Sequence, residues 1–168
     1  VEAAVQRMEE PGADGADDVE FLISTNPGES LKPLGRIASG GELSRVMLAI
    51  KTVLADQDAI ETVIFDEIDT GISGRTAQKV SEKLALIGRS RQVICITHLA
   101  QLASMADSHY CIEKRAVDGS TQTGIRLLDE QESVEELARI LGGAQITDAV
   151  IDNAREMKKL AQKFKAHR

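Results

Sequence analysis

The chain has 168 residues, a net charge of -7 and 42% hydrophobic residues, so we expect one globular domain with one core. Aromatic residues make up 2% and Trp is absent, so the core must be aliphatic. The net charge argues against a general polyanion-binding surface, although residues 1–20 hold seven acids against one base and residues 152–168 six bases against two acids.

The cysteines and the apolar runs predict the cellular compartment of the protein. Cys95 and Cys111 lie in apolar runs without a CxxC pair, which is typical of buried free thiols in a reducing compartment. No apolar run approaches the roughly 18 residues of a membrane span. We therefore predict a cytoplasmic protein that does not use a membrane. Because residue 1 is Val rather than Met, we also expect the chain to be a piece of a longer protein.

The amino-terminal part offers few structural signals. We predict a linker or junction with at most a short element over residues 1–18, because Pro11-Gly-Ala-Asp-Gly-Ala-Asp17 interrupts any helical spacing. A short β-type run follows at residues 19–24 and ends at the turn Asn26-Pro27-Gly28. A loop then leads to residue 38.

Helices and strands alternate from residue 39 to residue 106. A helix is predicted from about Gly41 to Ala55, and its apolar residues fall on one face: Leu43, Val46, Met47, Ile50 and Leu54. The run 62–66 reads as a strand buried on both faces, and 92–97 as a second one. Between them a helix ending near Gly88 should face inward with Ala77, Val80, Leu84 and Ile87, and a short helix should end at Ala106. This order predicts an α/β fold, with a mainly parallel sheet and flanking helices.

The last third combines a hairpin with two helices. Residues 110–117 and 121–129 flank Asp118-Gly119, a strong turn signal that predicts an antiparallel hairpin at the edge of the sheet. Ser133-Val-Glu-Glu136 matches a capping box, and the helix it opens should end at Gly142-Gly143. A long terminal helix should start near Thr147, with an inward face made of Val150, Ala154, Met157, Leu160, Ala161 and Phe164.

Two adjacent carboxylates follow the first apolar strand. Open α/β sheets place their ligands at the carboxyl ends of the strands, where Asp66 could hold Mg²⁺, usually through water. Glu67 could polarise an attacking water as a general base. A solvated strand end is the alternative, and the strand expected to be buried on both faces argues against it.

Ser39-Gly40-Gly41 opens the first predicted helix. The tripeptide lacks bulky side chains, and its amides would lie at a helix N-terminus that favours an anion such as phosphate. A simple helix start with Ser39 as the N-cap is the other interpretation. Gly35 to Gly40 has the glycine spacing of a P-loop, but Gly41 and Glu42 stand where that motif needs Lys and Ser or Thr, so the chain has no P-loop.

His98 follows the second strand. Neighbouring parallel strands would bring it near Asp66, where a neutral imidazole could donate to a γ-phosphate and report its presence. A structural role is the alternative for a lone histidine at a strand end.

With these motifs in order, the chain resembles the carboxy-terminal half of an ABC-type ATPase head, in particular that of the SMC-like RecN family of bacterial DNA repair proteins. Ile37-Ala-Ser-Gly-Gly-Glu-Leu-Ser-Arg45 resembles the signature motif, and Val63-Ile-Phe-Asp-Glu67 the Walker B strand. Ile68-Asp-Thr-Gly-Ile-Ser-Gly74 resembles the D-loop and Ile96-Thr-His98 the switch histidine. The resemblance assigns residues 19–168 to this half of the head.

The resemblance implies that two heads form a homodimer with ATP and Mg²⁺ between them. Ser39, Gly40 and Gly41, with Glu42 beside them, would act on the nucleotide of the other subunit, and Asp69 would help to couple the subunits. His98 would sense the γ-phosphate. The P-loop and a long coiled coil would lie in a missing amino-terminal half. Head engagement would control DNA association in double-strand break repair, at the bacterial nucleoid.

Two other functions stay open. A transporter nucleotide-binding domain commonly carries Gln where Glu42 stands and Pro where Ile68 stands, so both positions favour the repair branch. A non-enzymatic DNA- or partner-binding module would use the basic tail, residues 155–168.

Overall fold

The computed structural model describes residues 1–24, 28–36, 39–54, 59–117 and 120–167. The expected turns at Asn26-Pro27 and Asp118-Gly119, and the residues Ile37, Ala38 and Ala55, lie outside these ranges. The α/β class is confirmed, because a parallel pair of strands with flanking helices is accompanied by antiparallel hairpins. No helix in the described ranges is long and apolar enough to cross a membrane.

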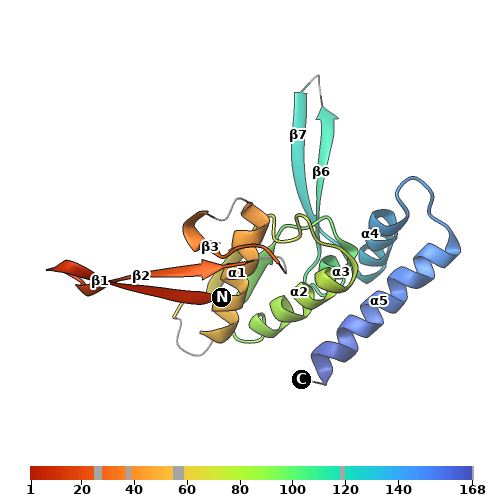
Figure 1. Cartoon of the computed structure of the whole chain (residues 1–168). Helices are drawn as coiled ribbons and strands as arrows, with labels where there is room; N and C mark the ends of the chain where they lie inside the picture. Colours follow the sequence, from red (N-terminus) through yellow and green to blue (C-terminus); the bar gives the residue numbers. More distant parts are fainter. Residues whose placement is uncertain (25–27, 37–38, 55–58, 118–119, 168) are drawn as a thin grey trace.

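The amino-terminal residues form a projecting β-hairpin (Figure 1). β1 (Glu2–Gly12) pairs antiparallel with β2 (Gly15–Ile23), with Val5 opposite Val19, and β3 (Lys32–Pro33) adds a short third strand before the 3₁₀ helix η1 (Leu34–Arg36). The linker predicted for residues 1–18 is therefore wrong. The Pro-Gly-rich segment is the end of the hairpin, where Gly15 has a φ of 135° that other residues rarely adopt. The domain boundary at residue 19 stays a prediction.

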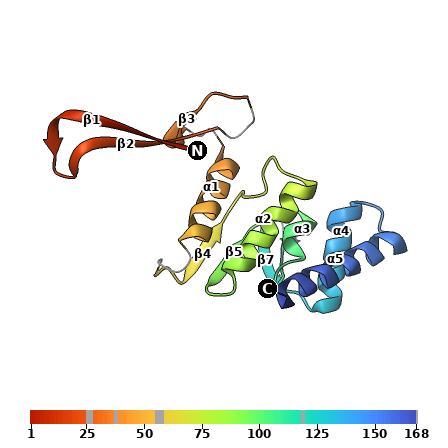
Figure 2. The same cartoon turned by 60° about the horizontal axis from the view of Figure 1, so that its bottom comes forward.

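The parallel sheet supports the candidate site. β4 (Thr62–Phe65) pairs in parallel with β5 (Gln92–Cys95), and α1 (Gly40–Val53) and α2 (Gly74–Ile87) lie beside them (Figure 2). The core against this sheet contains Leu48, Phe65, Ile68, Ala77, Val80, Leu84, Ile87 and Leu102. The inward face predicted for α2 is confirmed, because its four members are all buried there.

The opposite face of the parallel sheet is open in the described structure. Val63, Phe65 and Val93 contact the core, whereas Ile64 is 65% exposed and Ile94 is 44% exposed. The prediction that the strand is buried on both faces is therefore wrong. Side chains alternate along a strand, and in the described residues only one face is covered.

α1 is amphipathic as predicted, but its predicted apolar face is largely open. Leu48 is the buried apolar side chain of this helix. Four of the residues predicted to share one face are exposed: Leu43, Met47, Ile50 and Leu54. Periodicity identifies an apolar stripe on a helix without identifying what covers it.

The second hairpin is confirmed, but it is not an edge of the parallel sheet. β6 (Tyr110–Val117) and β7 (Ser120–Leu127) form a two-stranded sheet of their own that projects beyond the helices (Figure 1). Tyr110 lies opposite Leu127 and Ile112 opposite Ile125, and these four apolar side chains are exposed. The short helix α3 (Ala100–Ala103) precedes the hairpin.

The two last helices pack on each other. α4 (Glu130–Gly142) begins at Asp129, whose side chain accepts from the amide of Glu132 in a capping box, so the box predicted at Ser133 is wrong. The predicted end at Gly142-Gly143 is confirmed. α5 (Asp148–Ala166) starts at Thr147 as predicted and buries Ala154 and Ala161, whereas Leu160 is exposed and the predicted inward face is wrong at that position.

Candidate functional site

The candidate site lies at the carboxyl ends of β4 and β5. Phe65 pairs with Cys95, and the amide of Ile96 donates to the carbonyl of Phe65 at 3.0 Å. The residues that follow, Asp66 and Glu67 on one strand and Thr97 and His98 on the other, therefore emerge side by side. The predicted alignment of His98 with the acidic strand is confirmed.

The two carboxylates are both exposed, and the backbone between them is constrained. Oδ1 of Asp66 accepts from the amide of Glu67 at 2.9 Å. Glu67 has a φ of 57°, and no other non-glycine residue in the described ranges has a positive φ. Such a conformation is uncommon and concentrates at functional sites. The strain therefore supports a functional rather than an incidental strand end.

The Ser-Gly-Gly turn packs against Glu67 of the same chain. Ser39 is the N-cap of α1, and its Oγ accepts from the amide of Glu42 at 3.1 Å. A Cβ atom on Gly40 would lie 2.6 Å from Oε2 of Glu67, and one on Gly41 would lie 2.8 Å from the carbonyl oxygen of Glu67. The close atom at Gly41 belongs to the backbone, so this position needs glycine, whereas at Gly40 the end of the Glu67 side chain would have to move. The carboxylate lies where the partial positive charge of the helix N-terminus favours an anion.

Two residues that sequence analysis did not single out hold the turn and the strand end together. Ser44 Oγ donates to the carbonyl of Asp66 at 2.9 Å. Nη1 of Arg45 donates to the carbonyl of Ile68 at 3.2 Å and to that of Thr70 at 2.9 Å. Both lie one turn into α1, inside the motif that was recognised by its glycines. Their position in that motif was the sequence signal that could have identified them.

Asp69 is buried, with 3% of its surface exposed, and contacts the end of β5. Its Oδ2 accepts from Thr97 Oγ1 at 2.6 Å and from the amide of His98 at 2.9 Å. Nδ1 of His98 lies 3.1 Å from the same oxygen. The carboxylate thus joins the loop after β4 to the turn after β5 within one chain. Its predicted role between subunits stays a prediction.

The site is negatively charged. The pKa of Cys95 is raised to about 12, first by burial of the thiol and then by the charges of Asp69 and Asp66. Among the described residues, no three His, Cys, Asp or Glu side chains are grouped to hold a metal. Mg²⁺ is commonly held by one or two carboxylates together with water and phosphate oxygens, so exposed Asp66 fits that mode and not a closed protein cage.

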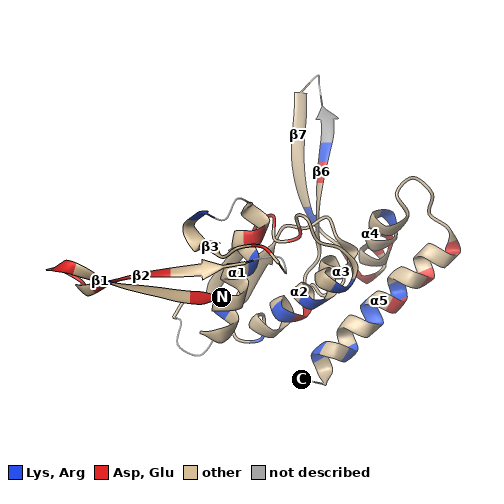
Figure 3. Ribbon diagram, in the orientation of Figure 1, with Lys and Arg blue, Asp and Glu red and all other residues tan. Residues whose placement is uncertain are grey.

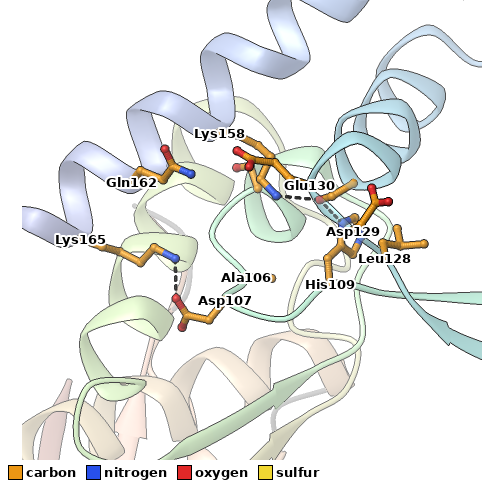
Figure 4. Close-up of a pocket in the computed structure, with 11 residues that line it drawn as sticks. Ala106, Asp107, His109, Leu128, Asp129, Glu130, Lys158, Gln162 and Lys165 are labelled. Atoms are coloured by element: carbon orange, nitrogen blue, oxygen red, sulfur yellow. Dashed lines mark hydrogen bonds and ion pairs between the residues drawn. The ribbon is translucent and has the colours of Figure 1, made fainter.

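A hollow of about 330 Å³ lies between α4 and α5, and none of the candidate site residues lines it (Figure 4). At its wall Ser133 is buried and bridges His109 Nδ1 and Lys158 Nζ, each at 2.8 Å. Burial lowers the pKa of His109, and the nearby Lys158 lowers it further. Lys165 donates to the carboxylate of Asp107 at 2.6 Å on the other side. Because Ser133 lies on α4 and Lys158 on α5, this polar cluster joins the two packed helices.

Charge is unevenly distributed over the fold (Figure 3). Acidic residues lie along the β1–β2 hairpin and basic ones along the second half of α5. Several basic side chains of the tail are engaged within the chain, since Arg155 pairs with Asp152 and Lys165 with Asp107. Lys159 and Lys163 are exposed.

Curated sequences match nearly the whole chain. A protein of Halalkalibacterium halodurans is 49% identical over 153 residues, which are 91% of this chain and 27% of the relative. The resemblance is to the DNA repair protein RecN. RecN of Bacillus subtilis is 50% identical over 90% of the chain and 26% of its own length, and RecN of Xylella fastidiosa strain 9a5c is 51% identical over 82% and 25%. The predicted resemblance to RecN is confirmed, and the chain spans about a quarter of the length of these relatives.

Two solved structures of SMC proteins also match part of the chain. One, from work on ATP-driven dimerisation and DNA-stimulated activation of SMC ATPases, is 20% identical with a TM-score of 0.49 and covers 83% of this chain and 81% of that one. The other is the Smc head bound to the C-winged helix domain of ScpA, 22% identical with a TM-score of 0.48, covering 76% of this chain and 38% of that one. No family model matches the chain.

Proposed function

We propose that the chain is the carboxy-terminal part of a RecN-type ATPase head that acts in the repair of DNA double-strand breaks. The observation that carries the proposal is the meeting of Asp66, Glu67 and His98 at the ends of two paired parallel strands, with the Ser-Gly-Gly turn beside them. Phosphoryl transfer needs a held metal ion, an oriented water and charge stabilisation, and these residues can supply the first two.

Each residue has a proposed part in ATP hydrolysis. Asp66 holds Mg²⁺ through water, Glu67 orients and polarises the attacking water, and His98 contacts the γ-phosphate. Mg²⁺ neutralises charge on the phosphates when it is bound. The turn at Ser39, Gly40 and Gly41 offers backbone amides to the ATP of a second head, with Glu42 beside it. We therefore expect a homodimer with ATP between the heads.

The missing half with the P-loop is the first proposed partner. The chain has no P-loop, and an apolar surface near the site is open in the described structure. Apolar side chains are exposed along α1, and Ile64 and Ile94 are exposed on the open face of the sheet. Exposed apolar side chains in such numbers mark interaction sites, so the amino-terminal half is expected to cover them.

The test uses the full-length protein that contains this segment, or its two halves expressed together. Glu67→Gln should bind ATP as the parent does and lower turnover by about 100-fold or more, because the water loses its base. Glu61→Gln, an exposed change just before the same strand, is the matched control and should keep full turnover. Undiminished hydrolysis by Glu67→Gln would remove Glu67 from the proposed role.

DNA binding distinguishes this proposal from the binding-module alternative. We expect DNA affinity to respond to ATP in the full-length protein and to survive removal of residues 155–168. Affinity that ignores ATP and disappears with the tail would favour the module instead. A transporter domain would show no ATP-dependent DNA binding.

A further inference from the structure

The contacts of Asp69 affect which ring nitrogen of His98 carries a proton. This inference rests on the proposed function of the site. A buried carboxylate is costly unless polar groups surround it. Here the described donors all come from the turn after β5: the hydroxyl of Thr97 and the backbone amide of His98, with Nδ1 of His98 beside them. The oxygen they share, Oδ2, therefore controls the environment of one ring nitrogen.

Hydrogen bonds hold the backbone on both sides of Asp69. Nη1 of Arg45 binds the carbonyls of Ile68 and Thr70, the residues on either side of Asp69. Ile68 is fully buried. The loop is thus held by hydrogen bonds and burial on both sides of Asp69, whereas the ring of His98 is exposed.

The proton of the Thr97 hydroxyl is directed at Asp69. Oγ1 of Thr97 accepts from the amide of Leu99 at 3.0 Å, which leaves its own hydrogen for Oδ2 of Asp69. The carboxylate is thus held as an acceptor by neutral donors. Its negatively charged Oδ2 lies 3.1 Å from Nδ1 of the imidazole, and the hydroxyl and the amide that donate to it carry no charge.

We propose that Asp69 is a positioning residue that keeps a proton on Nδ1 of His98 and leaves Nε2 as the nitrogen that meets the nucleotide. A lone pair on Nδ1 would face an anionic oxygen, which is unfavourable. A neutral imidazole carries one proton, so a ring protonated on Nδ1 presents an acceptor at Nε2.

This arrangement changes the expected chemistry of His98. The neutral ring was expected to donate to the γ-phosphate, but with the proton on Nδ1 it accepts instead, for instance from water. Donation from Nε2 to a phosphate oxygen requires the doubly protonated ring. Asp69 would then balance the added positive charge, as the orienting carboxylate does for other catalytic histidines.

Ring-nitrogen NMR shifts of histidine in the full-length protein test the tautomer directly. His98→Gln assigns the signal. We expect His98 of the parent to carry its proton on Nδ1. Asparagine can still accept from Thr97 and from the amide of His98, so Asp69→Asn should fold. Its oxygen lacks the negative charge, so the variant should hold the Nδ1 proton less strongly and show a larger share of rings protonated on Nε2. A parent ring protonated on Nε2, or equal shares of the two tautomers in the parent and in Asp69→Asn, would overturn the proposal, and the parent spectrum alone decides if the variant does not fold.

The kinetics of ATP hydrolysis separate a positioning role of Asp69 from a purely structural one. Asp69→Asn should lower kcat for ATP hydrolysis about tenfold or more, with KM for ATP within about threefold of the parent. Thr97→Val removes one hydrogen bond to the carboxylate but keeps its charge, and should keep the tautomer and most of kcat. Equal losses in the two variants would contradict a role in proton placement. A parent that fails to hydrolyse ATP would instead overturn the proposed function and leave the tautomer result standing.

Discussion

The backbone at Gly41 lies so close to Glu67 that a Cβ atom on the glycine would be 2.8 Å from the carbonyl oxygen of the glutamate. Gly41→Ala must therefore displace backbone atoms, and we expect the free energy of unfolding to fall by about 1–3 kcal/mol. Denaturant titration measures the change. Gly124→Ala is the matched control, because its added Cβ meets nothing within 4 Å, and its change should stay within about 0.5 kcal/mol. Equal stability of the two variants would contradict the close approach.

Arg45 should stabilise the loop after β4 through its two carbonyl contacts. Arg45→Lys cannot reproduce both bonds in the same geometry, so we expect the free energy of unfolding to fall by about 1–2 kcal/mol. Arg155→Lys provides the comparison, since Arg155 makes an exposed pair with Asp152 and its replacement should change stability by less than about 0.5 kcal/mol. If Arg45→Lys is as stable as the parent, the loop is held by other contacts.

Ser133 should matter for stability far from the candidate site. Ser133→Ala leaves Lys158 and His109 without the hydroxyl that bridges them, so a loss of about 1–3 kcal/mol is expected in denaturant titration. Ser81→Ala is a close control, because Ser81 is also fully buried in a helix but donates to Gln78 in its own turn. Its loss should be about 0.5 kcal/mol or less. Similar losses at both serines would argue against the bridge.

Stability should fall on mild acidification because of His109. Its folded pKa lies below the ordinary value of 6.5, so the unfolded chain takes up this proton first. The free energy of unfolding is therefore unaffected by His109 above pH 6.5 and decreases as the pH drops below it. His109→Gln should flatten the curve between pH 6.5 and 5, measured by denaturant titration at each pH.

The titration of Glu136 does not contribute to the change in stability between pH 6.5 and 5. Its pKa is lowered from 4.5, mainly by the hydrogen bond from Arg139, so its contribution is present above pH 4.5 and is lost only at lower pH. A slope between pH 6.5 and 5 that persists in His109→Gln would assign the effect to another group.

Much of the site could be predicted from the sequence. The parallel strands, the helix after the Ser-Gly-Gly turn and the alignment of His98 with Asp66 follow from short-range patterns and from the rule that parallel strands end at one edge. The role of Arg45 could not be predicted in this way. A hydrogen bond to a carbonyl 25 residues away depends on tertiary packing, which periodicity does not encode.

The failures have specific physical reasons. Pro11-Gly-Ala-Asp-Gly15 has the composition of a linker, and the pairing of Val5 with Val19 decides that it is a hairpin end. Asp129 and Ser133 each precede an acid by three residues, so both match a capping box. The helix starts at Asp129, where both hydrogen bonds of the box are made, and Ser133 lies inside the helix and contacts Lys158.

The positive φ of Glu67 sets stability against activity at one position. A side chain in this conformation costs of the order of 1 kcal/mol that glycine would not incur. A library of variants sorted for heat resistance alone should therefore replace Glu67 with glycine or asparagine. Sorting for ATP turnover should restore glutamate, so that the two laboratory selections would drive this single codon in opposite directions.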